Sequence, residues 1–194
     1  MTERLADPLW RNATDLCRDL QRGTIAATTL MENVYERIAV LNPRLNALVD
    51  LIPQEQAMAL AATADAAPIV ERGPLHGLPM APKDAVAVRG FSTSWGYASF
   101  ADTIEEQDDE LARRLREAGA IFIGHSNMPE FGLGSHTFNR LYGHTYNPYN
   151  ISKTPGGSSG GAAVALAADL LPLADGSDLG GSLRNPASFC NVVG

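Results

Sequence analysis

Residues 154–161, Thr-Pro-Gly-Gly-Ser-Ser-Gly-Gly, are the stretch that decides the fold. An alanine-rich run at 162–168 follows directly, and a second glycine–serine segment, Asp-Leu-Gly-Gly-Ser-Leu-Arg-Asn-Pro, occupies 178–186. Alanine loses no side-chain conformational entropy in a helix, so residues 162–168 are predicted to be helical. The apolar residues 170–174 are predicted to form a short buried strand. The two glycine–serine turns would then enclose one helix and one strand.

Paired glycines beside a serine, as at Ser158 and Ser182, suggest an acyl-transfer site. Glycine lets the backbone approach a bound atom and point N–H groups toward it, which places a nucleophilic hydroxyl beside an oxyanion hole. Two other interpretations fit the same residues: a helix N-terminus that binds an anion, or turns that serve only close packing. The stretch matches neither the P-loop ending Gly-Lys-Ser/Thr nor Gly-x-Gly-x-x-Gly.

The composition describes a globular protein of one ordinary domain or part of a larger one. Of 194 residues, 45% are hydrophobic and 19% are charged, and the formal charge of −7 argues against a general nucleic-acid or anionic-membrane surface. Residues 1–16 carry scattered charges, so no signal peptide is expected, and no apolar run approaches the roughly 20 residues of a membrane span. We therefore expect a cytoplasmic protein. Cys17 and Cys190 suggest neither a disulfide nor a metal set.

Three helices are predicted in the N-terminal third. The first covers 12–23 and ends at Gly23, and the third covers 53–67 with a proline at its first turn. The second is predicted to begin at a cap on Thr28 or Thr29 and to end at Asn42-Pro43. The buried faces are expected to contain Leu16 and Leu20 in the first helix, and Leu30, Val34, Ile38 and Leu41 in the second.

A strand that ends in a lysine is predicted next. Prolines and glycines exclude a helix over 73–84, and Leu78, Met80 and Ala81 suggest a strand that enters the core, with Lys83 at its end. Of 15 basic residues only two are lysine, and lysine, unlike arginine, can give up its proton. A side chain whose head group reaches solvent is the simpler interpretation of this lysine, and a catalytic base is the alternative.

An α/β alternation follows. Residues 108–119 are predicted to form an amphipathic helix with Leu111, Leu115 and Ala118 facing inward, and a short apolar strand is predicted over 120–124.

Two loops are predicted around this region, at 126–134 and at 139–153. His136 and His144 lie near the second loop, and no Asp or Glu is placed by pattern to pair with either. A Ser-His-Asp triad is therefore not expected.

Three segments, taken together, resemble the amidase signature family. The glycine–serine stretch 156–161 with 178–190 looks like the family's long signature. Residues 79–84, Pro-Met-Ala-Pro-Lys-Asp, are similar to its lysine segment, and 126–131, Ser-Asn-Met-Pro-Glu-Phe, resemble its Thr-Asn-Met-x-Glu-Phe loop. The resemblance runs from about residue 25 to the end of the chain.

The resemblance implies an α/β fold, namely the N-terminal part of an amidase-signature fold with a mixed central sheet covered by helices on both faces. Residues 1–70 would be an N-terminal helical layer and 71–194 the first part of the catalytic core. Family members continue for a few hundred residues more, so the apolar end at 192–194 is expected to mean that the rest is missing or supplied by another chain. Leu179 and Ser126 depart from the family pattern, but neither change removes a catalytic group.

The activity that the resemblance implies is amide-bond hydrolysis through a Ser–cis-Ser–Lys triad and an acyl-enzyme. By motif position, Ser182 is the nucleophile, Ser158 is the bridging serine preceded by a cis peptide, and Lys83 is the base. Burial disfavours the charged form of a lysine, so a neutral amine could draw a proton from the bridging serine. The oxyanion hole is expected from the backbone N–H groups of Leu179, Gly180, Gly181 and Ser182.

Further roles follow from the same resemblance. The backbone around Gly132 would touch the substrate, and Ser159, Asp178 and Arg184 would hold the two loops together. The expected partner is a small-molecule amide, with no cofactor, metal, membrane or nucleic acid, and a homodimer is left open. Two alternatives are an amidase-type subunit of a tRNA-dependent amidotransferase and a non-catalytic amidase-like module.

Overall fold

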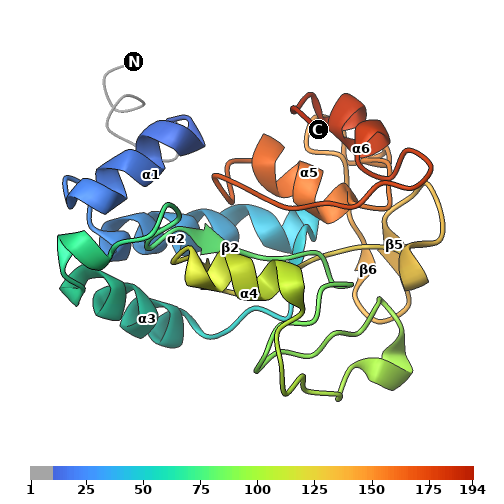
Figure 1. The fold of residues 1–194 in the computed structure, drawn as a ribbon. Helices are drawn as coiled ribbons and strands as arrows, with labels where there is room; N and C mark the ends of the chain where they lie inside the picture. Colours follow the sequence, from blue (N-terminus) through green and yellow to red (C-terminus); the bar gives the residue numbers. More distant parts are fainter. Residues whose placement is uncertain (1–10) are drawn as a thin grey trace.

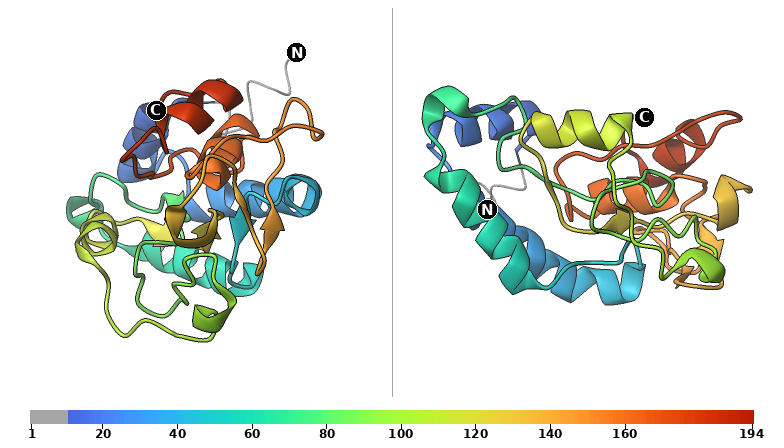
Figure 2. Two further views of the ribbon diagram at one scale, coloured as in Figure 1. Left: turned by 90° about the vertical axis from the view of Figure 1, so that its right-hand side faces the viewer. Right: turned by 60° about the horizontal axis from the view of Figure 1, so that its bottom comes forward.

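The computed structural model describes residues 11–194, and Figure 1 shows their arrangement. Helices α1 and α3 lie at one end, α6 and the strands β5 and β6 lie at the other, and α2 runs between them below α5 (Figures 1 and 2). The helices are α1 (Ala13–Arg22), α2 (Ala27–Leu45), α3 (Gln54–Ala66), α4 (Glu110–Glu117), α5 (Gly160–Ala167) and α6 (Arg184–Cys190). The strands are β1 (Leu48–Val49), β2 (Pro79–Met80), β3 (Ile121–Phe122), β4 (His125–Ser126), β5 (Phe138–Asn139) and β6 (Gly143–His144).

The predicted N-terminal helices are all present, but the cap of α2 comes from a neighbouring helix. Asp65 of α3 accepts hydrogen bonds from the backbone N–H groups of Ala27 and Thr28, at 2.6 and 3.0 Å. The prediction of a cap on Thr28 or Thr29 was therefore wrong. A carboxylate distant in sequence satisfies the free N–H groups of the first turn, which no local pattern indicates.

The end of α2 was also predicted wrongly, because the helix continues through Pro43 to Leu45. Asn46 then adopts a left-handed conformation with φ of 51°, and its N–H donates to the Asn42 carbonyl at 2.7 Å. The Asn42 side chain accepts from the N–H groups of Ala47 and Leu48, which leads the chain into β1. The expected core faces are confirmed, with Leu16, Leu20, Leu30, Val34 and Ile38 buried and Leu41 packed against them.

Strand pairing brings distant segments together as three short pairs rather than one continuous sheet within residues 11–194. β2 runs parallel to β3 with Pro79 opposite Ile121, and β1 runs antiparallel to β4 with Leu48 opposite Ser126. An isolated parallel bridge joins Lys83 to Ser126. The segment 121–126 therefore has the lysine segment on one side and β1 on the other, which makes the pairing mixed. β5 and β6 pair antiparallel inside the region predicted to be loop.

The predicted strand at 170–174 does not form. Leu170 and Leu171 are buried, but both N–H groups donate to the Ala165 carbonyl in the turn that ends α5. Pro172 has no N–H to offer a neighbouring strand. The segment instead runs as irregular chain beside Lys83, and this route carries two polar residues into the site.

Helix α4 is confirmed, but its buried face differs from the prediction. Ala112 is fully buried, Leu115 is half-buried against the core, and Leu111 is 42% exposed. The helix begins only at Glu110, after an N-cap on Asp109 whose side chain accepts the Ala112 N–H. The buried face of α4 is narrow and is centred on Ala112 rather than on Leu111. The amphipathic pattern alone predicts the position of this face only to within one residue.

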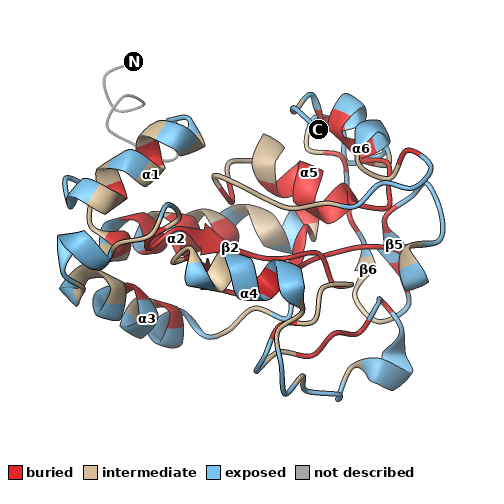
Figure 3. Cartoon of the chain, in the orientation of Figure 1, coloured by how far each residue is buried: buried red, intermediate tan, exposed pale blue. Residues whose placement is uncertain are grey.

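Helix α5 packs against β1 and β4 at very close range, and Figure 3 shows its buried surface. A methyl group built on Gly161 would lie 2.3 Å from the Asn127 nitrogen and 2.6 Å from the Ala47 carbonyl oxygen. The packing interpretation of the glycines is therefore correct for this position. It also fixes the first turn of α5, and with it the two serines that precede the helix.

Gly161→Ala is expected to lower the free energy of unfolding by about 1–3 kcal/mol, although alanine is otherwise the better helix former. The reason is that the added methyl group meets backbone atoms, which cannot move aside as a side chain can. Urea unfolding followed by circular dichroism measures the change. Gly180→Ala is the control, since the backbone there is not in the left-handed region and open space surrounds the position of the new methyl group. Wild-type stability for Gly161→Ala would contradict the close approach.

Among residues 11–194, no helix is both long and apolar enough to cross a membrane. Cys17 and Cys190 are free thiols, as the sequence suggested. The signal-peptide expectation rests on residues 1–16, of which 1–10 lie outside the described residues.

Candidate active site

Lys83 lies inside the protein at the end of the β2 segment, where it is only 2% exposed. The interpretation of a lysine that reaches solvent is therefore wrong. Its ammonium group donates hydrogen bonds to the hydroxyls of Ser158, Ser159 and Ser177, at 2.7, 3.0 and 2.9 Å. A protonated lysine has three N–H donors, and here each has a serine acceptor.

Burial changes the acidity of this lysine. Loss of hydration lowers the pKa of Lys83 from its ordinary value to about 8, while the negative charges of Asp175 and Asp178 oppose the change. A group with this pKa is mainly protonated at pH 7 but exchanges its proton readily near neutral pH. The site can therefore hold a base that surface lysines cannot provide.

The serine loop reaches Lys83 just before α5. The peptide bond between Gly157 and Ser158 is cis, as the family resemblance implied. Ser158 and Ser159 are each 2% exposed, so both hydroxyls are held away from bulk water. The Ser159 hydroxyl also accepts the Ser177 N–H at 3.2 Å, which ties the loop to the irregular segment that follows residues 170–174.

Ser182 lies in the second glycine–serine loop, beside the first. The Ser159 N–H donates to the Ser182 carbonyl at 2.9 Å, so the backbones of the two loops are bonded together. Within residues 11–194 no hydrogen bond joins the Ser182 hydroxyl to Ser158. The side chains of Lys83 and Ser158 are thus hydrogen-bonded to each other, whereas Ser182 is joined to the first serine loop only through its backbone carbonyl.

Asp178 organises the loop that carries Ser182. Its carboxylate accepts the N–H groups of Gly181, Leu183 and Arg184 at 2.7, 3.0 and 3.1 Å. The Arg184 guanidinium adds an ion pair at 2.8 Å, and these hydrogen bonds hold the pKa of Asp178 well below its usual range. The N–H of Gly181 is therefore engaged by a carboxylate in this structure.

The other three expected oxyanion donors have no such partner. Leu179 and Gly180 are exposed and Ser182 is half-buried, and across the described residues 11–194 their N–H groups make no hydrogen bond within the chain. They are free to bind a ligand oxygen.

Gly132 faces Ser158 from the loop 130–134. A methyl group built on Gly132 would lie 3.7 Å from the Ser158 hydroxyl oxygen, and the residue has φ of 69°. The preceding residue, Phe131, also adopts a positive φ of 56°, and its N–H donates to the Trp95 carbonyl. This loop therefore forms one wall beside the Lys83–Ser158 pair.

Two residues of the site were not found from sequence, namely Asp175 and Ser177. The Asp175 carboxylate accepts the Lys83 backbone N–H, and Ser177 accepts from the ammonium group. One signal was present, since a buried ammonium group needs three acceptors and the first serine loop offers only Ser158 and Ser159. Which third residue would serve depended on the path of the chain after α5, where the strand predicted at 170–174 does not form.

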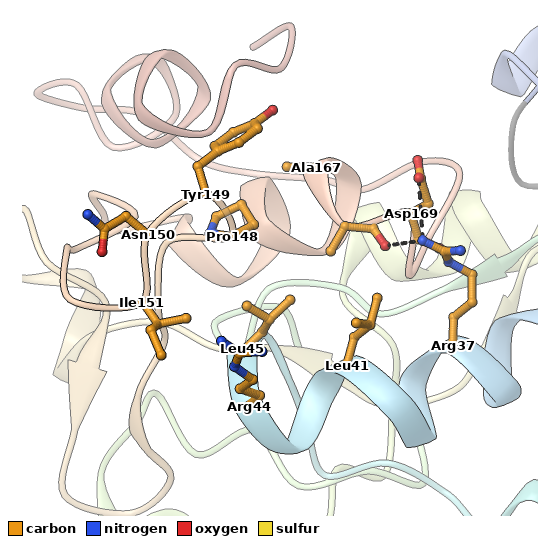
Figure 4. A pocket seen from close by; sticks show the side chains of 11 residues that line it. Arg37, Leu41, Arg44, Leu45, Pro148, Tyr149, Asn150, Ile151, Ala167 and Asp169 are labelled. Carbon is orange, nitrogen blue, oxygen red and sulfur yellow. Dashed lines mark hydrogen bonds and ion pairs between the residues drawn. The ribbon is translucent and has the colours of Figure 1, made fainter.

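A separate open pocket of about 550 Å³ lies between α2, residues 148–151 and the end of α5 (Figure 4). There the Arg37 guanidinium donates to the carbonyls of Ala168 and Asp169, each at 2.9 Å. None of the residues around Lys83 lines this pocket. Within the described part of the chain, no group of three His, Cys, Asp or Glu side chains could hold a metal ion.

Comparison with known proteins agrees with this arrangement. The model of the family described as Amidase matches residues 29–194. The chain is 40% identical over 184 residues to a glutamyl-tRNA(Gln) amidotransferase subunit of Lysinibacillus sphaericus, covering 95% of this chain and 38% of that protein. It is 39% identical over 192 residues to the acylamidase of Rhodococcus erythropolis, covering 95% and 39%.

Among solved structures, the chain is similar to 6-aminohexanoate cyclic dimer hydrolase in complex with its substrate. The TM-score is 0.83 at 32% identity, covering 94% of this chain and 37% of that one. The chain belongs to the amidase signature family. It spans about two fifths of the length of the relatives it matches.

Proposed function

We propose that this chain is the N-terminal part of an amide-bond hydrolase, which converts a carboxamide to an acid and ammonia or an amine. The observation that carries the proposal is the 2.7 Å hydrogen bond between the buried Lys83 ammonium group and the Ser158 hydroxyl. A buried lysine that is hydrogen-bonded to a serine can act as a base and take the proton of that serine. Membership of the amidase family supports the same reaction.

The reaction begins with proton transfer. Neutral Lys83 takes the proton of Ser158, and Ser158 takes the proton of Ser182, whose oxygen attacks the amide carbon. This step needs contact between the two serine hydroxyls, so we expect the Ser182 side chain to turn toward Ser158 when substrate binds. Ser158 then returns a proton to the departing amine, and water releases the acid from the acyl-enzyme.

The oxyanion of the tetrahedral intermediate would be bound by backbone N–H groups of the second loop. Those of Leu179, Gly180 and Ser182 have no partner within the described chain, whereas that of Gly181 would have to leave Asp178. Loss of one such donor typically costs on the order of 100- to 1000-fold in rate. Asp178 and Arg184 would set the shape of this loop.

The fold of the complete protein belongs to the same proposal. We expect the mixed pairing around 121–126 to extend into a central sheet with helices on both faces, because the chain spans only 38% of its amidotransferase relative. The division into a helical layer at 1–70 and a core from 71 remains a prediction.

An amidase-type subunit of a tRNA-dependent amidotransferase is the second candidate. The relatives named as acylamidase and as amidotransferase component are 39% and 40% identical, so identity does not separate the two functions. The formal charge of −7 favours the free hydrolase, since contact with tRNA usually requires a basic surface. The absence of a nucleic-acid partner is a prediction that follows from the free hydrolase, and a homodimer stays open.

Hydrolysis is expected to rise with pH, with a midpoint near the pKa of Lys83 at about 8. The reason is that only the neutral amine acts as a base, and about one lysine in ten is neutral at pH 7 with such a pKa. The test is release of ammonia or amine from aliphatic, aryl and peptide amides, with kcat/KM measured between pH 6 and 9 under constant ionic strength.

The control for this experiment is the same panel supplemented with charged tRNA and the other components of an amidotransferase. Activity that appears only with those additions would favour the amidotransferase. Reactivity that falls between pH 7 and 9 would contradict a neutral lysine as base.

A further inference from the structure

A partly buried carboxylate that forms no ion pair within the described residues lies directly against the backbone of Lys83. Both oxygens of Asp175 accept the Lys83 N–H, at 3.1 and 3.3 Å. Asp175 comes from the irregular segment after α5, and Lys83 comes from the end of the β2 segment. The contact therefore fixes the strand end that carries the lysine to the loop that carries Ser177.

The other acid near Lys83 differs from Asp175 in its partners. Asp178 forms an ion pair with Arg184 and accepts three backbone N–H groups, so its charge is largely satisfied locally. In the described residues no Lys, Arg or His side chain forms an ion pair with Asp175. Its field consequently acts on the nearest buried cation, which is Lys83.

Burial shapes both members of this pair. Loss of hydration raises the pKa of Asp175, while the Lys83 N–H, its own N–H and the Lys83 charge lower it. The negative charge of Asp109, the N-cap residue of α4, also raises the pKa of Asp175. For Lys83, desolvation lowers the pKa, and the negative charge of Asp175 is the largest opposing effect. The two groups therefore stabilise each other's charged forms.

We propose that Asp175 is a positioning residue for the amide hydrolysis, which anchors Lys83 through its backbone and sets the pH at which Lys83 becomes a base. This inference rests on the proposed function, in which neutral Lys83 starts the proton relay. Asp175 itself neither gives nor takes a proton in the reaction. Its negative charge favours the protonated form of Lys83 before the reaction, in which the ammonium group donates hydrogen bonds to all three serine hydroxyls. The same charge keeps Lys83 from losing its proton until the pH is close to neutral.

The lysine content of this chain makes a direct measurement practical. Residues 1–194 contain only Lys83 and Lys153, so lysine labelled with ¹³C at Cε yields few signals in this region, and Lys83→Met assigns that of Lys83. Exposed Lys153 supplies the internal reference. Asp175→Asn keeps the size and an oxygen acceptor for the Lys83 N–H, but removes the charge. The matched control is Asp102→Asn, which removes one charge from an exposed residue.

In Asp175→Asn the Lys83 titration is expected to move to lower pH by roughly one pH unit, which is the lower end of the effect of a neighbouring opposite charge. Asp102→Asn should leave it in place. An unchanged Lys83 midpoint in folded Asp175→Asn would overturn the role of Asp175. If that variant does not fold, the wild type provides the test, because the Lys83 signal should show a second, smaller step in acid as Asp175 protonates. Absence of that step would also overturn the inference.

Kinetics separate this inference from the proposed function. In Asp175→Asn the rise of kcat/KM with pH should move in the same direction as the lysine titration, whereas lost anchoring alone would lower kcat without moving the midpoint. A shifted lysine titration in a protein that hydrolyses no amide would overturn the proposed function and leave the coupling of Asp175 to Lys83 standing. An unshifted Lys83 titration in Asp175→Asn, together with amide hydrolysis by the wild type, would overturn the role of Asp175 and leave the proposed function standing.

Discussion

Replacement of Lys83 with methionine is expected to lower kcat/KM for amide hydrolysis by at least about 10⁴-fold, because the relay loses its base. Methionine has a similar length and no charge, so it can occupy the buried space without an unpaired ammonium group. The hydroxyls of Ser158, Ser159 and Ser177 would lose a shared donor but could bond to water or to one another. The variant should therefore remain folded, which circular dichroism and thermal unfolding would establish.

The control is Lys153→Met, which removes the other lysine from an exposed loop position and should leave kcat/KM within about twofold. Addition of small primary amines to Lys83→Ala offers a second comparison, since an amine of suitable size could enter the vacated space and restore part of the rate. Hydrolysis by Lys83→Met at a wild-type rate would exclude Lys83 as the base.

Ser182→Ala is expected to abolish both turnover and covalent labelling by a fluorophosphonate. The wild-type chain, with a mass of 20.7 kDa, should gain a single adduct in the intact mass spectrum. Formation of the adduct requires a nucleophilic hydroxyl, a base and an oxyanion hole, so it tests the assembled site without the need to know the substrate. Loss of the nucleophile removes all reaction that passes through an acyl-enzyme, a fall on the order of 10⁶-fold in comparable hydrolases.

Ser188→Ala is the matched control, since Ser188 is exposed on α6 in the same part of the chain. It should label at the wild-type rate. A single adduct on Ser182→Ala would assign the nucleophile to another serine, with Ser158 the next to test. A folded protein of full amidase length that contains this chain and gains no adduct would favour the non-catalytic module.

Much of the helical framework could be read from local patterns. Leu16, Leu20, Leu30 and Val34 are buried as predicted because helix periodicity places them on one face, and that relation depends only on neighbours along the chain. Errors arose where a distant group intervened. Asp65 of α3 caps the start of α2. Helix α2 also continues through Pro43, where the sequence predicted its end, and stops at Asn46.

Some residues of the candidate site could likewise be predicted from sequence, and others could not. Lys83, Ser158 and Ser182 were predicted from the residues and the family resemblance, because glycine–serine turns and a rare lysine are visible in a single sequence. Asp175 and Ser177 were missed. They follow the segment 170–174 that was predicted as a strand, and the irregular path of the chain after α5 brings both to Lys83.

The sequence by itself determined the residue types of the relay and the flexible turns that could present them, since these are properties of the residues. Only the tertiary structure decided that the Lys83 side chain is buried, that its charge is shared among three serines, and that a lone carboxylate lies behind it. Burial and electrostatic interaction depend on groups far apart in the chain, and these groups meet only when Gly161 lets α5 pack directly on the strands. The chemistry of the lysine is therefore a property of the fold.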